Sequence, residues 1–151
     1  MTSEKRGRQN VKNTEPVLDV GLYLRGIDLD PAVITSTLGI APSKSRVTGE
    51  KWITSSKREV TAKVGLWFLD TTTDSPLLRD RLAWLIQQLD RFDGGLTSIP
   101  GVQDAEISVF IALAENDRGG GDYEFDLTAE DLASISRLGV PLKFSITYVK
   151  P

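Results

Sequence analysis

The stretch DLDPAVITSTLGIAPSKSR, residues 28–46, contains a complete helix signal that leads directly into a strand signal. Asp30 is a typical N-cap, because its carboxylate can accept hydrogen bonds from the first free backbone amides, and Pro31 suits the first helical position. Gly39 is a typical C-terminal stop. The same pattern of N-cap, short helix and glycine stop recurs at residues 128–141. Because helix-terminating sequences are generally alike, this repetition is explained more simply without an internal duplication. The sequence therefore predicts short helices that alternate with strands.

Alternating or continuous apolar runs predict the strands. Residues 17–26 alternate between apolar and polar side chains, which is typical of a strand with one buried face. Residues 64–69 and 104–115 are largely apolar on both faces, which favours central strands. We expect residues 104–115 and 123–127 to form a hairpin through the glycine-rich residues 116–121. The remaining expected elements are strands at residues 43–52, 57–70 and 142–149 and a longer helix at residues 76–92.

These elements predict one α+β domain over residues 16–151. We expect a mixed, largely antiparallel sheet with short helices packed on it, in the order β-α-β-β-α-β-β-α-β. The length of 151 residues is that of one typical domain. Residues 1–15 form a polar arm that we expect to be disordered, although its cations could touch phosphate or anionic lipid. These cations are Lys5, Arg6, Arg8 and Lys12.

The composition excludes several kinds of catalytic site. The chain has no histidine and no cysteine, so serine–histidine and cysteine–histidine nucleophile systems are excluded and both leading zinc ligands are missing. Glu50, Asp70 and Asp74 could supply a carboxylate pair of the kind that glycosidases use, but nothing in the sequence brings them together. We therefore expect no catalytic residue, no metal site, no cofactor and no enzymatic activity.

Charge and hydropathy also narrow the class of partner. The net charge of −3 argues against nucleic acid, except through the basic arm. No apolar run approaches the roughly 20 residues that span a bilayer, so we expect no membrane insertion. The absence of cysteine fits the cytoplasm. A protein or a small anionic ligand is left as the expected partner.

Lys44 and Arg46 are the strongest candidates for a binding site. If residues 43–48 form a strand, both cations project from one face, close to Trp52 and, we expect, Trp67. Two interpretations are open. The cations can form a patch for an anion or an acidic partner, with a tryptophan for cation–π support. Alternatively, they protect an edge strand from aggregation.

Several motifs of the chain resemble a bacterial family catalogued as domain of unknown function 4279. They are DLDPAVITSTLGIAPSKSRVTGE, then GLWFL, then YEFDLTAEDLASISRLGVPLKFSIT, and the resemblance extends from about residue 17 to 149. It implies a fold and recurring residues, but no reaction. Carried over to this chain, the recurring residues are Asp30, Pro31, Leu38, Gly39, Pro42, Lys44, Gly49 and Trp67.

The sequence supports three hypotheses on function. The first is a non-enzymatic protein-interaction module; small domains of this look also resemble immunity-type inhibitors encoded beside toxins, by analogy of context. The second is a small-ligand or anion-binding domain with Lys44, Arg46, Trp52 and Trp67 around the ligand. The third, an enzyme that uses carboxylates, ranks last because no base, nucleophile and orienting group can be assembled. A concave pocket would favour a ligand, whereas an open patch would favour a protein partner.

Overall fold

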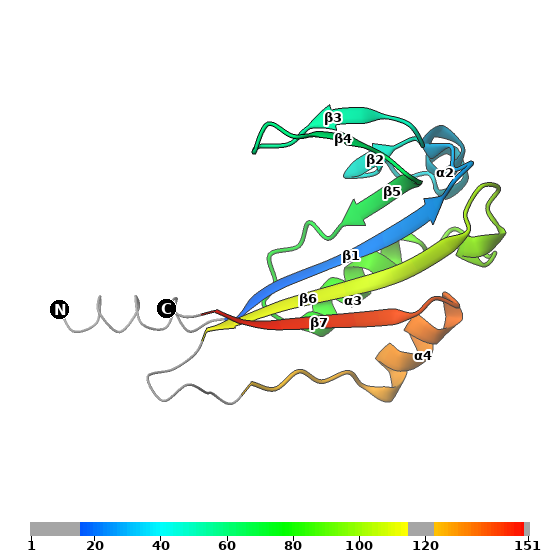
Figure 1. Ribbon diagram of the computed structural model, residues 1–151. Coiled ribbons are helices and arrows are strands. Elements are labelled where there is room, and N and C mark those ends of the chain that lie inside the picture. The colour runs from blue at the N-terminus through cyan, green and yellow to red at the C-terminus, as the bar shows by residue number, and fades with distance from the viewer. Residues whose placement is uncertain (1–15, 115–122, 150–151) are drawn as a thin grey trace.

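The computed structural model describes residues 16–114 and 123–149 of the chain, and Figure 1 shows the arrangement of their elements. The arm at residues 1–15 and the glycine-rich residues 116–121 lie outside this description. The elements, in chain order, are β1 (Val17–Gly26), α2 (Pro31–Leu38), β2 (Lys44–Arg46), β3 (Lys51–Ile53), β4 (Glu59–Thr61), β5 (Gly65–Asp70), α3 (Leu78–Gln88), the 3-10 turn η1 (Leu96–Ser98), β6 (Asp104–Ala114), α4 (Ala129–Arg137) and β7 (Leu142–Val149).

The described strands form one five-stranded sheet and one separate hairpin. The sheet has the order β2-β5-β1-β6-β7, and β3 pairs with β4 in the hairpin. All pairs are antiparallel except β6 with β7, which are parallel. Helix α4 forms the crossover that a parallel neighbour requires. The predicted fold class, α+β with a mixed and largely antiparallel sheet, is confirmed.

Two strand predictions differ from the structure. The predicted strand at residues 57–70 is interrupted, because its first part pairs with β3 in the hairpin and its second part enters the sheet as β5. Residues 123–127 form no strand. Both edges of β6 are already occupied, one by β1 and the other by β7, so the expected hairpin between β6 and residues 123–127 has no free edge to use.

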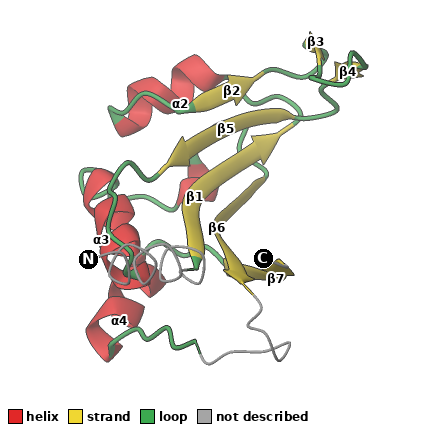
Figure 2. Ribbon diagram, turned by 90° about the vertical axis from the view of Figure 1, so that its left-hand side faces the viewer, coloured by secondary structure: helices red, strands yellow, loops and turns green. Residues whose placement is uncertain are grey.

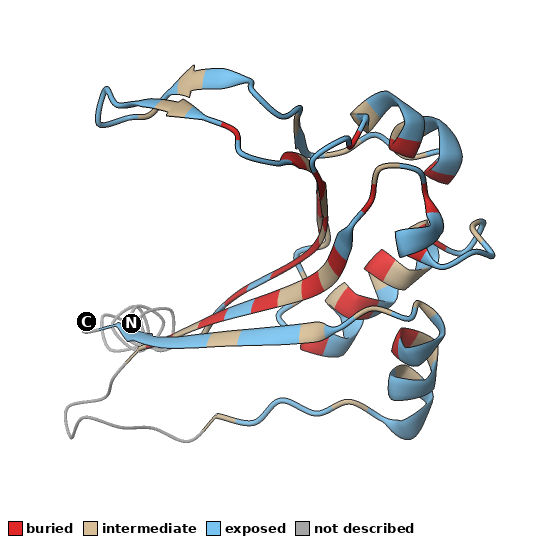
Figure 3. Cartoon of the chain, turned by 45° about the vertical axis from the view of Figure 1, so that its right-hand side comes forward, coloured by how far each residue is buried: buried red, intermediate tan, exposed pale blue. Residues whose placement is uncertain are grey.

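The core lies between the sheet and the helices. Figure 2 shows α2, α3 and α4 on one side of the sheet, and in Figure 3 buried residues occur along the central strands and on these helices. The alternation along β1 explains this, because every second residue from Leu18 to Leu24 is buried. Among the described residues, the largest fully buried side chains are Trp67, Leu22, Leu24, Ile34, Leu82, Leu85, Leu96, Ile107, Ile111, Val20 and Val109.

The helix ends follow the capping signals. The Asp30 carboxylate accepts from the amide of Ala32 at 3.0 Å, and Gly39 adopts a left-handed φ of 71°. In α4, Thr128 and Asp131 form the predicted capping box. Helix α3 begins at Leu78, later than predicted, after a turn in which the Ser75 hydroxyl accepts from the amide of Leu77. In the part of the chain that is described, no helix is long and apolar enough to cross a membrane.

None of the helices in residues 16–114 and 123–149 lies on the other face of the sheet. Figure 3 shows the hairpin β3–β4 projecting from the sheet on the side opposite the helices. The side chains on this open face include Tyr23, Phe68 and Phe110, with Tyr23 and Phe68 in aromatic contact at 4.4 Å between ring centroids. The expectation that the apolar strands are covered on both sides is therefore not met by the helices of the described residues.

Candidate functional site

Lys44 and Arg46 lie on the open face of the sheet. In the antiparallel register of β2 with β5, Lys44 is opposite Phe68 and Arg46 is opposite Leu66. Directly opposed residues share a face, and the residue between them on β5, Trp67, faces the helices. The prediction that the two cations project together from one face of a strand is confirmed by this register.

Trp52 reaches the same site from the hairpin. The guanidinium carbon of Arg46 lies 3.3 Å from the centroid of the Trp52 ring, which is a cation–π contact. Hydrogen bonds fix the base of the hairpin: the amide of Gly49 donates to the carbonyl of Ala62, and the amide of Ala62 donates to the carbonyl of Glu50, each at 2.8 Å. Gly49 has a φ of 88°, a conformation that favours glycine, so the turn into the hairpin depends on it.

The sheet and the base of the hairpin together enclose a shallow depression of about 360 Å³, which we call the basic cradle. Cations line its rim, and the side chains of Val64 and Leu66 give it an apolar floor. Its lining contains no carboxylate. The full lining is Arg25, Lys44, Arg46, Trp52, Thr61, Ala62, Lys63, Val64 and Leu66.

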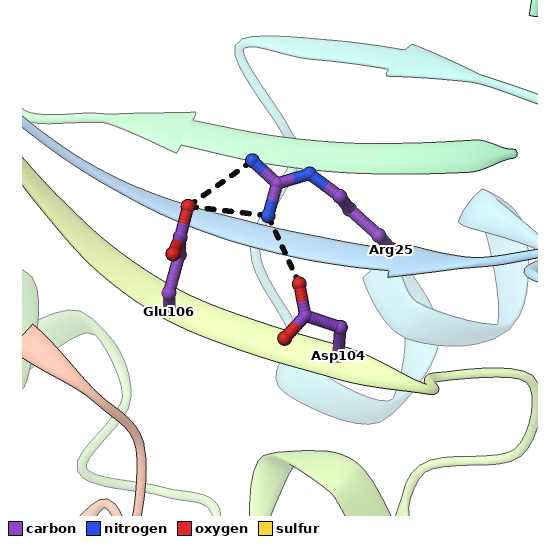
Figure 4. A network of polar contacts seen from close by, with 3 residues as sticks. All are labelled: Arg25, Asp104 and Glu106. Carbon is purple, nitrogen blue, oxygen red and sulfur yellow. Dashed lines mark hydrogen bonds and ion pairs between the residues drawn. The ribbon is translucent and has the colours of Figure 1, made fainter. Parts of the chain in front are cut away.

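The four cations of the cradle differ in how far their charge is offset. Figure 4 shows Arg25 held by two carboxylates, Asp104 at 3.0 Å and Glu106 at 3.2 Å. Arg46 has a longer ion pair of 3.8 Å with a partly exposed glutamate. Lys44 and Lys63 are exposed and have no ion pair with any other residue in the described ranges. The uncompensated positive charge of the cradle therefore sits on these two lysines.

Trp67 is not part of the cradle. Its side chain is fully buried, and its Nε1 donates a hydrogen bond of 3.1 Å to the hydroxyl of Thr35 on α2. It therefore lies on the opposite face of the sheet from Trp52. A buried indole normally finds a partner for its N–H, and Thr35 is that partner, which gives Trp67 a packing role between β5 and α2.

The three candidate catalytic carboxylates lie on different segments of the structure. Glu50 pairs with Arg46 beside the cradle. Asp70 lies four residues beyond Leu66, the partner of Arg46 on β5, and the rise of a strand places it roughly 13 Å from Leu66. Burial, and then the nearby charge of Asp19, raise the pKa of Asp70 above its usual range. Asp74 is an exposed loop residue. No group of three or more acidic or histidine side chains within residues 16–114 and 123–149 could hold a metal ion.

Two of the four cations of the cradle, Arg25 and Lys63, were not identified from the sequence. Lys63 falls inside the stretch predicted as one continuous strand, but it lies in the break between β4 and β5, where it lines the cradle together with Lys44. Arg25 is at the polar face of β1, and its position there follows from the alternation of that strand. Its proximity to β2 depends on the strand order, which the sequence does not contain.

The comparisons with known proteins agree with the motifs. No curated protein and no solved structure matched the chain. One family model matches residues 16–149, which is nearly the whole chain and includes every element described above. The protein therefore belongs to the family described as Domain of unknown function (DUF4279).

Proposed function

We propose that this protein is a non-enzymatic interaction module that binds an acidic segment of a partner protein in the basic cradle. The observation that carries the proposal is the pair of exposed lysines, Lys44 and Lys63, at the rim of an apolar depression without a carboxylate in its lining. Hydrogen bonds between such cations and carboxylates are among the stronger ones in proteins. The apolar floor would take the aliphatic or aromatic residues between the acidic ones.

The openness of the cradle favours a protein segment over an enclosed small molecule. The two lysines of its rim are exposed, and so is Val64 of its floor, with 40% of its surface accessible. Pockets for small molecules bury most of the ligand surface, which this shape does not support. The cradle shares the open face of the sheet with Phe110, which is 38% exposed and stands six residues along the β1–β6 pair from Arg25. An extended partner could therefore contact both the cradle and the sheet.

The setting that we propose is the bacterial cytoplasm. The absence of cysteine supports a reducing compartment, and the family resemblance supports a bacterial source. An immunity-type inhibitor, which covers a surface of another protein without chemistry of its own, is one form that such a module could take. The absence of histidine and cysteine from the chain supports a role without catalysis.

A small anionic ligand is the second candidate. The volume of about 360 Å³ falls within the roughly 300–1,000 Å³ of known ligand pockets. A compact dianion could bridge Lys44 and Lys63 and lie against the Trp52 ring. This candidate requires the same cations, so the two are separated by the size of the ligand and not by mutation.

The test is the fluorescence anisotropy of a labelled peptide that alternates glutamate and leucine, titrated with the full chain. We expect binding that weakens with salt and no binding of the matched lysine–leucine peptide. The affinity should be at least about tenfold lower for Lys63→Glu or Lys44→Glu, since one lost charge-assisted bond is worth about 1.5–3 kcal/mol. Arg91→Glu is the matched control, because Arg91 is exposed after α3 on the helix side. Equal losses in the cradle and control variants would refute the site. Full competition by millimolar citrate would favour the small anion instead.

A further inference from the structure

The outer edge of the sheet is formed by β7, and it is long and apolar. None of the strands in the described parts of the chain pairs with this edge, which runs over eight residues from Leu142 to Val149. Phe144, Ile146 and Tyr148 form a row on it and are 46%, 57% and 57% exposed. A strand edge of this kind presents unpaired backbone N–H and C=O groups beside an apolar surface.

Phe144, Ile146 and Tyr148 point to the same face of the sheet as the buried residues of β6. In the parallel register with β6, Phe144 aligns with Val109, Ile146 with Ile111, and their β6 partners are buried. Helix α4 leads into the start of β7, where Leu142 is packed against the core. Beyond Leu142 the residues on the same side of β7 are left uncovered.

The sequence of β7 contains little that would protect this edge. Natural edge strands are shortened, charged, bulged or interrupted by proline. The opposite edge follows this rule, because β2 has only three residues and two of them are the cations Lys44 and Arg46. In contrast, β7 has no proline and a single charged residue, Lys143, near its start.

We propose that β7 pairs with β7 of a second copy of this chain, in antiparallel register about a two-fold axis through Ile146. This register places Phe144 opposite Tyr148 of the other copy and Ile146 opposite its own counterpart. Ser145 then faces Thr147 on the other side of the sheet. Aromatic and hydroxyl pairs are both favourable across strands, and no like charges face one another within β7. The edge is therefore complementary to itself.

The surface is large enough for a weak dimer. A whole aromatic side chain presents roughly 150–250 Å². Each of the half-exposed side chains in the row therefore has about 100 Å² to bury, and the six of a pair have about 600 Å². The backbone edges and flanking residues bring the total toward the roughly 1,000 Å² of a specific but weak interface. We expect dissociation constants in the micromolar range, strengthened by salt because each copy has a net charge of −3.

Sedimentation velocity of the full chain between about 1 and 200 µM tests the pairing. We expect a shift from monomer to dimer, which Ile146→Lys abolishes because it places two lysines on the symmetry axis. Ile53→Lys is the matched control, since Ile53 is 72% exposed on the hairpin and should leave the dimer intact. Circular dichroism melts check that both variants fold. A wild-type protein that stays monomeric at 200 µM, or equal effects of the two variants, would overturn the proposal.

Cross-linking gives a second test that does not depend on losing an interaction. The chain contains no cysteine, so Ile146→Cys introduces a single thiol. Opposed residues of an antiparallel pair have Cα atoms about 4.5–5.5 Å apart, within the range of a disulfide. We expect Ile146→Cys to form a disulfide-linked dimer under mild oxidation, and Phe144→Cys not to, because its counterpart lies roughly 13 Å away along the strand. The opposite result would refute this register.

Discussion

The replacement of Trp67 separates the packing role that the structure assigns to it from the binding role that the sequence suggested. Trp67 is fully buried between β5 and α2, and its Nε1 is satisfied by Thr35. Trp67→Ala would leave a cavity the size of an indole ring and would remove the hydrogen-bond partner of the Thr35 hydroxyl. Substitutions of this type cost about 3–5 kcal/mol. Near 150 residues, each kcal/mol lowers the melting temperature by about 3–4 °C, so we expect a loss of roughly 10–20 °C.

Trp52→Ala is the matched comparison on the same protein. Trp52 is partly exposed on the hairpin, and its described interaction in the site is the cation–π contact with Arg46. Contacts of this kind at exposed positions are worth about 0.5–1 kcal/mol, so the melting temperature should fall by no more than a few degrees. The affinity for the acidic peptide should fall instead, because the ring forms one side of the cradle.

Thermal and urea unfolding, followed by circular dichroism, measure both variants, and peptide anisotropy measures their binding. A further variant, Trp67→Phe, keeps most of the buried volume but removes the hydrogen bond to Thr35, so its cost should fall between those of the other two. A loss below about 1 kcal/mol for Trp67→Ala would refute the core position of this side chain. Wild-type affinity in Trp52→Ala would remove Trp52 from the proposed site.

Three further predictions concern pH and close packing. Burial raises the pKa of Asp70, so this carboxyl group binds a proton more tightly in the native state than in the unfolded state. The free energy of unfolding therefore falls as pH rises from about 3.8 through the raised pKa. Asp70→Asn should raise the melting temperature at pH 7 relative to wild type, and this difference should disappear below pH 3.8. Hydrogen bonds from the backbone amide and hydroxyl of Thr128 lower the pKa of Asp131. The ionised cap therefore stabilises α4 above pH 3.8, and this stabilisation is lost as pH falls through the lowered pKa. The melting temperature of Asp131→Asn should fall less steeply with decreasing pH than that of wild type. A Cβ at Gly26 would overlap the carbonyl oxygen of Gly101, so Gly26→Ala should lower the free energy of unfolding by about 1–3 kcal/mol in urea titrations, and an unchanged midpoint would contradict this packing.

Local signals in the sequence were sufficient for most elements of this fold. The caps of α2 and α4 depend on residues within four positions of each other, so Asp30, Thr128 and Asp131 could be read directly. The strands β1 and β5 follow from alternation and apolar runs. Residues 123–127 were misread because a strand needs a free neighbour as well as a suitable pattern, and both edges of β6 are occupied.

The candidate site was predictable only in part, for a related reason. Lys44 and Arg46 share a face because of the period of a strand, which is local information. Trp52 is six residues from Arg46 along the sequence and Trp67 is twenty-one, but which of the two lies beside the cations depends on which face of the sheet carries the helices. Trp67 faces α2, and Trp52 faces the open side because the hairpin folds over β2. Arg25 and Lys63 join the cradle through strand order and a break in a strand, which are properties of the whole fold.

The two proposed surfaces lie at opposite edges of one sheet, and this has a consequence for binding. Antiparallel pairing of β7 continues the sheet into a second copy with both open faces on the same side, because opposed residues share a face. From β2 of one copy to β2 of the other there are then nine strand steps of about 4.8 Å, or roughly 43 Å. A partner with two acidic segments joined by a flexible linker that spans this distance could occupy both cradles, and the second contact would form at high effective concentration. The tandem peptide should therefore bind the dimer at least ten times more tightly than the single peptide does, and Ile146→Lys should remove this gain without changing the affinity for the single peptide. A gain that persists in the monomeric variant would show that the two cradles do not act together.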